Sequence, residues 1–125
     1  MDIQKQIDYW ITSGQEDLEA GCLLLAKGHL RHAMYLAHLA VEKTLKARVT
    51  KITKDVPPRI HNLERLAMLA GISLSKNRKK ILVDLEIYQQ AGRYPDPSQA
   101  AIDKKTASRD FRAAEEMIIW LKNQL

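Results

Sequence analysis

The sequence contains few of the residues that cross-link, bend or interrupt a chain. Of its 125 residues one is cysteine, five are glycine and four are proline, and aromatic residues make up only 6%. The single cysteine, Cys22, excludes a disulfide within the chain and favours a reducing compartment. Because Cys22 lies at the edge of an apolar helical stripe, we expect a small buried thiol rather than a nucleophile.

Several signatures of other protein classes are also missing. No stretch approaches the roughly 20 apolar residues of a membrane-spanning helix, and the first residues are charged where a signal peptide is apolar. We therefore expect a cytoplasmic protein that does not associate with a membrane. Neither a G-x-x-x-x-G-K-[ST] phosphate loop nor a G-x-S-x-G nucleophile motif occurs.

Closely spaced metal ligands are absent as well. The cysteine is alone, and no two of the four histidines lie four residues apart. His38 and Glu42 are one helical turn apart, but two ligands do not make a closed site. We expect neither a metal nor a cofactor.

What the sequence does contain is basic and helix-forming. Twenty Lys and Arg residues outnumber fifteen Asp and Glu, which gives a formal net charge of +5. This excess attracts anions such as nucleotides or RNA, although many small basic domains bind none. Hydrophobic residues make up 46% of the chain, enough for one domain of this length to bury a core.

Apolar residues recur every three or four positions along four long segments, a spacing typical of amphipathic helices. These segments are residues 3–26, 31–52, 76–91 and 103–125. A short helix follows Asn62, a residue suited to cap it, and ends at Gly71. Pro57 and Pro58 interrupt the chain before it. The loop after the third long segment holds Gly92, Pro95 and Pro97. Residues 1–125 therefore form a single all-α domain, an antiparallel up-down bundle of four long helices plus one short helix.

Two patterns concern how the helices pack. Gly14 and Gly21 lie on the buried line of the first helix, which predicts close approach of a neighbouring helix. Residues 76–91 are apolar on two faces, the second of which carries Val83 and Ile87. Together with a flat, alanine-rich face on residues 31–52, this second face predicts a homodimer.

One helix also carries an unusual polar stripe. At 100° per residue, a single side of residues 31–52 presents Arg31, Tyr35, His38, Glu42 and Lys46. Such a stripe is either the solvent-exposed side of a bundle helix or a binding surface. Periodicity alone does not distinguish the two.

Three motifs occur in a recognisable order. The run AVEKTLKA at 40–47 is followed by a proline-containing loop, then by HNLERL at 61–66 and GRYPD at 92–96. In this order and spacing, and with Trp10 and Asp17-Leu18 near the start, the sequence resembles the HEPN family (higher eukaryotes and prokaryotes nucleotide-binding domain). The resemblance covers nearly the whole chain. It implies a dimeric helical bundle commonly encoded beside a minimal nucleotidyltransferase, in pairs that look like toxin–antitoxin modules. It also extends to the helical domain of kanamycin nucleotidyltransferase.

Some HEPN branches are metal-independent ribonucleases in which an Arg and, four to six residues later, a His on a late helix act on the phosphodiester. This chain departs from that pattern, because no histidine follows Arg93, Arg109 or Arg112. The one formal match, Arg31 to His38, lies on the second helix.

Candidate site residues come from the polar stripe and the two proline-containing loops, where binding groups concentrate on a rigid scaffold. Tyr94 offers a stacking surface and Arg93 a phosphate contact, and His61 could contact phosphate beside the free N–H groups of a helix start. The ligand-binding candidates are Arg93, Tyr94, Arg59, His61, Glu42, Lys43 and Lys46. No residue is assigned as catalytic, and the candidates for that role are His61, His38 and Arg93.

Three functions remain open from the sequence. The first is a homodimeric domain that binds a nucleotide, RNA or a nucleotidyltransferase partner, without enzymatic activity or with little. The second is a metal-independent RNA-cleaving toxin that uses His61 or His38 with Arg93. The third is a purely structural dimerisation module.

Overall fold

Five helices account for most of the residues described by the computed structural model, which are 2–94, 96–98 and 101–125. They are α1 (Ile3–Ala26), α2 (Leu30–Thr53), α3 (Leu63–Leu69), α4 (Lys76–Arg93) and α5 (Lys104–Asn123). Within these residues no strand occurs. The predicted all-α bundle of four long helices and one short helix is confirmed.

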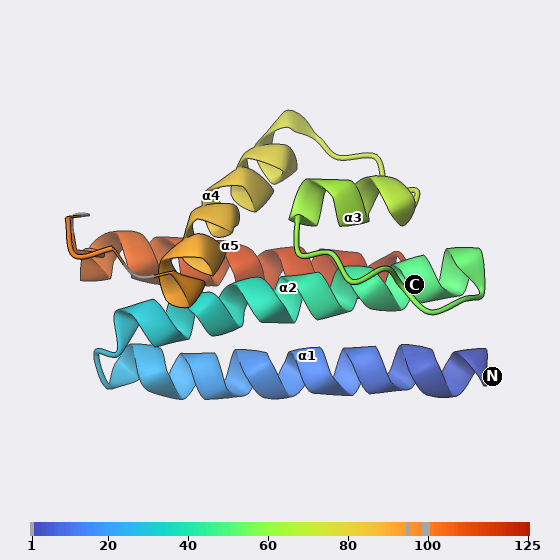
Figure 1. The fold of residues 1–125 in the computed structure, drawn as a ribbon, viewed down its shortest axis with the longest axis horizontal. Helices are drawn as coiled ribbons and strands as arrows, with labels where there is room; N and C mark the ends of the chain where they lie inside the picture. Colours follow the sequence, from blue (N-terminus) through green and yellow to red (C-terminus); the bar gives the residue numbers. More distant parts are fainter. Residues whose placement is uncertain (1, 95, 99–100) are drawn as a thin grey trace.

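Helix α2 is the centre of the bundle, since it contacts each of the other four helices. In Figure 1, α1, α2 and α5 run side by side along the length of the molecule, and successive long helices reverse direction. Helices α3 and α4 cover α2 from one side, with α4 inclined to it. A polar side chain on that side of α2 is therefore placed beneath other elements rather than in water.

The helix boundaries follow from capping groups that the sequence supplies. Asn62 accepts a hydrogen bond from Arg65 N, and Ser75 accepts one from Arg78 N, at the starts of α3 and α4. Asp103 does the same for α5 through Lys105 N. Gly28 and Gly71 adopt positive φ values of 84° and 67° just after α1 and α3, a conformation that glycine adopts without strain.

The two glycines of α1 bring it unusually close to α2. A Cβ atom on Gly14 would lie 3.2 Å from the Ala40 carbonyl oxygen, and one on Gly21 would lie 3.2 Å from that of Ala33. The predicted close approach is confirmed. The alanines of α2 are fully buried within one chain, so the expectation that this face lies between subunits is wrong.

Three local expectations also need correction. Helix α4 continues through Gly92 and Arg93, whereas the sequence predicts that both lie in the loop after residue 91. It ends there because Tyr94 precedes a proline and leaves the helical conformation; Pro95 itself lies outside the described residues. The apolar periodicity of residues 31–52 predicts that Ile52 is buried, but its side chain is 48% exposed. Cys22 is exposed as well, because it projects from the outer side of α1 next to exposed Leu23.

The second apolar face of α4 remains uncovered in the monomer. Val83 is 45% exposed and Ile87 63% exposed, whereas Leu82, Leu85 and Tyr88 on the opposite side are buried in the core. Among the described residues, no helix is both long and apolar enough to span a membrane.

Candidate functional site

The polar stripe of α2 is largely buried, and Glu42 lies at its centre. The residue is only 3% exposed, and its two carboxylate oxygens have different partners. His61 Nδ1 donates to Oε1 at 3.1 Å, and Lys46 Nζ donates to Oε2 at 3.1 Å. Lys46 Nζ also lies 5.4 Å from the centroid of the Trp10 ring on α1. The hydrogen bond between His61 and Glu42 joins the segment before α3 to the middle of α2.

His38 extends this arrangement toward α4. Its side chain is fully buried, and its Nε2 lies 3.2 Å from Glu86 Oε1 and donates to it. Its Nδ1 is 3.8 Å from Glu42 Oε1. Glu86 Oε1 also accepts from Leu63 N at 2.7 Å, at the start of α3. We refer to His38, Glu42, Lys46, His61 and Glu86 as the α2 polar cluster.

Two N–H groups at the start of α3 are occupied by these contacts. Leu63 N donates to Glu86, and Arg65 N donates to the Asn62 side chain. The expectation that a phosphate near His61 would use N–H groups of this helix start is therefore wrong for these two groups.

Further along the same side of α2, Tyr35 is held by the end of α4. Arg93 Nη2 donates to the Tyr35 hydroxyl at 2.8 Å, and the guanidinium carbon lies 5.8 Å from the ring centroid. A Cβ atom on Gly92 would lie 2.7 Å from Tyr35 Cδ2. Glycine is required at this position because the Tyr35 ring packs directly on the backbone, not because the chain turns there.

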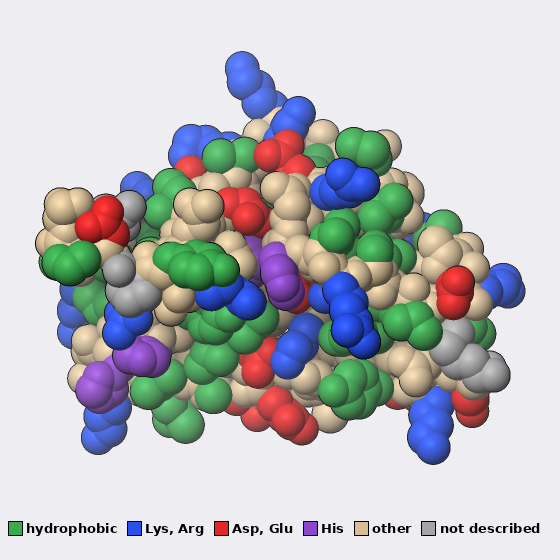
Figure 2. Space-filling model, viewed as in Figure 1, with side chains coloured by type: hydrophobic (Ala, Val, Ile, Leu, Met, Phe, Trp, Pro, Cys, Tyr) green, Lys and Arg blue, Asp and Glu red, His purple; other side chains and the backbone are tan. Residues whose placement is uncertain are grey.

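The structure places His61 and Arg93 on one side of α2 but not side by side. Their contacts, Glu42 and Tyr35, are seven residues apart, which is two turns or about 10 Å along the helix. The His61 side chain is 44% exposed, and Arg93 is exposed. Figure 2 shows a histidine in the middle of this face of the molecule with Lys and Arg side chains around it.

The remaining ligand-binding candidates, Lys43, Arg59 and Tyr94, form no contact with the α2 polar cluster. Lys43 extends toward α1, where its Nζ forms an ion pair with Asp17 Oδ2 at 2.7 Å and donates to Ser13 Oγ at 2.8 Å. Arg59 is exposed in the segment before α3. Tyr94 is 73% exposed and lines a shallow pocket with Ile87 and other residues at the end of α4. Among the described residues, no three His, Cys, Asp or Glu side chains are arranged to hold a metal ion.

A second buried polar contact joins α4 to α5 and shares no residue with the cluster. Tyr88 donates to Asp110 Oδ2 at 2.5 Å, and Arg109 donates to the other oxygen of this carboxylate. Burial, followed by the bond to Asp110, raises the pKa of the Tyr88 hydroxyl well above its usual range. The Tyr88 hydroxyl and both Asp110 carboxylate oxygens have hydrogen-bond partners, so we assign this contact a structural role.

Sequence reasoning missed the contributions of Glu86 and Gly92 to the site. Glu86 lies between apolar residues of α4, and its partners on α2 and α3 are 48 and 23 residues away, so no local pattern marks it. Tyr35 is on the predicted polar stripe, but its contacts with Arg93 and Gly92 of α4 could not be read from the sequence.

Comparisons with known proteins agree with this fold. The HEPN domain model matches residues 7–124. TT1696 from Thermus thermophilus has a similar structure, with a TM-score of 0.80 and 19% identity, over 96% of this chain and 98% of that one. ST0689, an archaeal HEPN homologue, has a TM-score of 0.74 and 20% identity, over 94% and 96% of the two chains. No match was found among curated proteins. The family model covers nearly the whole chain, and the protein therefore belongs to the HEPN domain family.

Proposed function

We propose that this HEPN-domain protein binds the phosphate groups of a nucleotide or of RNA on the side of α2 that carries His61 and Arg93. The observation that carries the proposal is the orientation of His61. Buried Glu42 accepts from its Nδ1 at 3.1 Å while nearly half of the side chain stays exposed. The far edge of the ring, with Nε2, has no partner among the described residues, and in a protonated imidazole it donates to an anion.

The spacing of the two exposed cationic groups limits the ligand. His61 and Arg93 are anchored about 10 Å apart along α2. A separation of this order suits the polyphosphate of a nucleotide or successive phosphates of RNA better than a single phosphate group. Arg93 supplies a planar donor for phosphate, and Tyr35 holds it in place. The side chain of Arg59 adds a third exposed cation in the segment that carries His61.

Two of the basic candidates support the surface without contacting a ligand. Lys46 is buried against Glu42, and Lys43 is paired with Asp17. Their charges are already balanced, so we assign them to the scaffold. Tyr94 shares its pocket with Ile87 of the exposed apolar face, and we assign it to subunit contact rather than base stacking.

We further propose that the protein acts as a homodimer within a toxin–antitoxin-type pair with a small nucleotidyltransferase. The exposed Val83 and Ile87 on α4 support the dimer. Support for the partner comes from the family resemblance, in which such pairs are common. A neighbouring gene that encodes a small nucleotidyltransferase, and co-purification of its product, would support this assignment; failure of the two purified proteins to associate would oppose it.

A metal-independent ribonuclease is the second candidate, and the Glu42–His61 pair favours it. A carboxylate that orients an imidazole is an arrangement used for general acid–base catalysis. Of the two histidine candidates, His38 is fully buried and His61 is accessible. We rank this function lower because no histidine follows Arg93, Arg109 or Arg112. Cleavage of single-stranded RNA in EDTA that is lost in His61→Ala would reverse the ranking.

Titration calorimetry with ATP, GTP and a short single-stranded RNA, each at two salt concentrations, tests the main proposal. We expect at least one ligand to bind, and its affinity to fall as salt rises, because phosphate contacts release counterions. If none of the three binds at millimolar concentration, the protein is a structural dimerisation module.

A further inference from the structure

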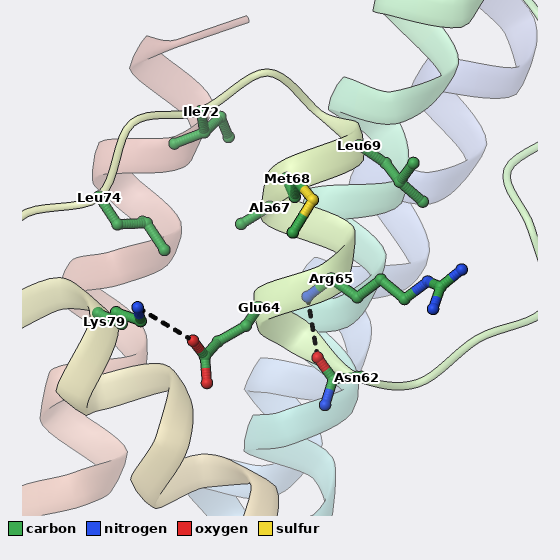
Figure 3. Close-up of a pocket in the computed structure, with 9 residues that line it drawn as sticks. All are labelled: Asn62, Glu64, Arg65, Ala67, Met68, Leu69, Ile72, Leu74 and Lys79. Atoms are coloured by element: carbon green, nitrogen blue, oxygen red, sulfur yellow. Dashed lines mark hydrogen bonds and ion pairs between the residues drawn. The ribbon is translucent and has the colours of Figure 1, made fainter.

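An open groove of about 760 Å³ lies between α3, the segment that follows it and the start of α4. Figure 3 shows Ile72 and Leu74 on one side of the groove and Ala67 and Met68 of α3 on the other. The Lys79–Glu64 ion pair, at 3.8 Å, closes one end. None of these residues belongs to the α2 polar cluster. We propose that this groove docks an acidic amphipathic helix of a partner protein.

The groove presents apolar side chains to solvent. Met68 is 76% exposed, and Leu69, on the outer side of α3, is 39% exposed. Exposed methionine is characteristic of surfaces that accommodate helical ligands, because its flexible, polarisable side chain adapts to the apolar residues it meets. Docking an apolar helix face here would remove Met68, Ile72 and Leu74 from water, which is favourable.

The charge of this part of the chain selects an acidic partner. Residues 59–80 contain six Lys and Arg and one Asp or Glu, whereas the remaining residues contain fourteen of each. Of these basic residues, Arg65 and Lys79 line the groove itself, where Lys79 pairs with Glu64, so the lining carries a net positive charge. Arg78 stacks on Trp120 and Lys80 pairs with Asp84, both outside the lining. Figure 2 shows hydrophobic side chains interspersed with Lys and Arg in the region of α3. A helix with acidic residues beside its apolar face complements this surface.

The composition of the groove favours a protein segment over RNA. No Phe, Tyr or Trp lines it, and single-stranded nucleic acids bind by stacking bases on aromatic side chains. Five of its nine lining residues are aliphatic or methionine, which suits leucine-type anchors of a helix. The lining includes neither Arg59, His61 nor Arg93, so the inference does not depend on the proposed phosphate-binding function.

Fluorescence anisotropy with a labelled synthetic peptide tests the inference on the full chain. The probe is an amphipathic peptide of about sixteen residues, long enough to form a helix, with Leu every third or fourth position and Glu beside them. Its controls are a Lys-flanked version and a scrambled Glu-containing version. We expect the Glu-flanked peptide to bind at least about tenfold more tightly than either control. Equal affinity of the three peptides, or no binding at millimolar concentration, would overturn the proposal.

Two variants locate the binding. Met68→Asp should weaken binding of the Glu-flanked peptide by about tenfold or more, whereas Leu23→Asp, an equally exposed site on α1, should change it less than about twofold. Lys79→Glu should shift the preference toward the Lys-flanked peptide. Methyl-labelled methionine spectra provide a readout that a folding defect would not mimic. The peptide should shift the Met68 signal and leave those of the buried Met34 and Met117 unchanged.

A competition experiment with RNA tests whether the groove binds nucleic acid rather than a protein helix. Displacement of the peptide by a short single-stranded RNA whose own affinity falls by about tenfold or more in Met68→Asp would identify the surface as an RNA-binding face, and the proposal would be wrong. Equal loss of peptide binding in Met68→Asp and Leu23→Asp would also overturn it.

Discussion

His61 Nδ1 lies 3.1 Å from Glu42 Oε1, across nineteen residues of sequence, and Lys46 Nζ lies 3.1 Å from the other oxygen of the same carboxylate. One buried anion therefore neutralises Lys46 and fixes the orientation of a half-exposed histidine. The stability of the bundle and the geometry of the proposed phosphate contact depend on the same side chain.

Replacing Glu42 by alanine should destabilise the fold strongly. The substitution leaves the Lys46 ammonium group buried without its partner, and loss of one member of a buried pair costs about 3–5 kcal/mol. Urea denaturation measures the change in the free energy of unfolding. Glu64→Ala, which removes an exposed pair with Lys79, is the matched control and should cost less than about 1 kcal/mol. Similar effects of the two substitutions would contradict the central role of Glu42.

Gly92→Ala should destabilise the end of α4 even though alanine favours helix. Its Cβ would meet the Tyr35 ring at 2.7 Å, and overpacking of this kind costs about 1–3 kcal/mol. The thermal unfolding midpoint reports the effect. Adding Tyr35→Ala should remove most of the penalty of the alanine at position 92, because the clashing ring is gone. Additive penalties in the double variant would show that the contact is not the cause.

Tyr88→Phe should lower the free energy of unfolding by about 1–3 kcal/mol, because Asp110 stays buried and loses its hydroxyl donor. The pKa of Tyr88 is raised in the folded protein, so its contribution is complete below the unfolded pKa of about 10 and is lost as pH rises through the folded pKa. Phenolate absorbance should show one tyrosine that ionises last. That last step should be absent from Tyr88→Phe; its persistence would contradict the assignment.

The helices could be predicted from the sequence, but the α2 polar cluster could not. Residues 3–26 and 76–91 show the three-four periodicity, and Asn62 and Ser75 mark helix starts, because these are local properties of the chain. Glu42 on a polar stripe looks the same in sequence whether it meets water or another helix. Its burial depends on α3 and α4 crossing α2, which is a tertiary relationship. Gly92 could not be predicted as a contact residue for the same reason. Its close contact with Tyr35 arises only when α4 packs on α2.

The exposed apolar face of α4 predicts the oligomeric state. Ile87 is 63% exposed, and we expect sedimentation equilibrium of the wild type to give twice 14.3 kDa. Ile87→Asp places a charge on this face without disturbing the core and should yield a monomer with an unchanged circular dichroism spectrum. A wild-type monomer, or a dimer that survives Ile87→Asp, would place the interface elsewhere or remove it.

Calorimetric titration of wild type, His61→Ala, Arg93→Ala and Arg112→Ala with the ligand that binds best tests whether phosphate binds on this side of α2. Arg112 is an exposed arginine on α5 and serves as the matched control. We expect His61→Ala and Arg93→Ala each to weaken binding by about 1–3 kcal/mol, the scale of a charge-assisted hydrogen bond. We also expect Arg112→Ala to leave affinity unchanged and Arg93→Ala barely to alter the melting temperature. Wild-type affinity in both His61→Ala and Arg93→Ala would contradict a phosphate-binding surface on this side of α2.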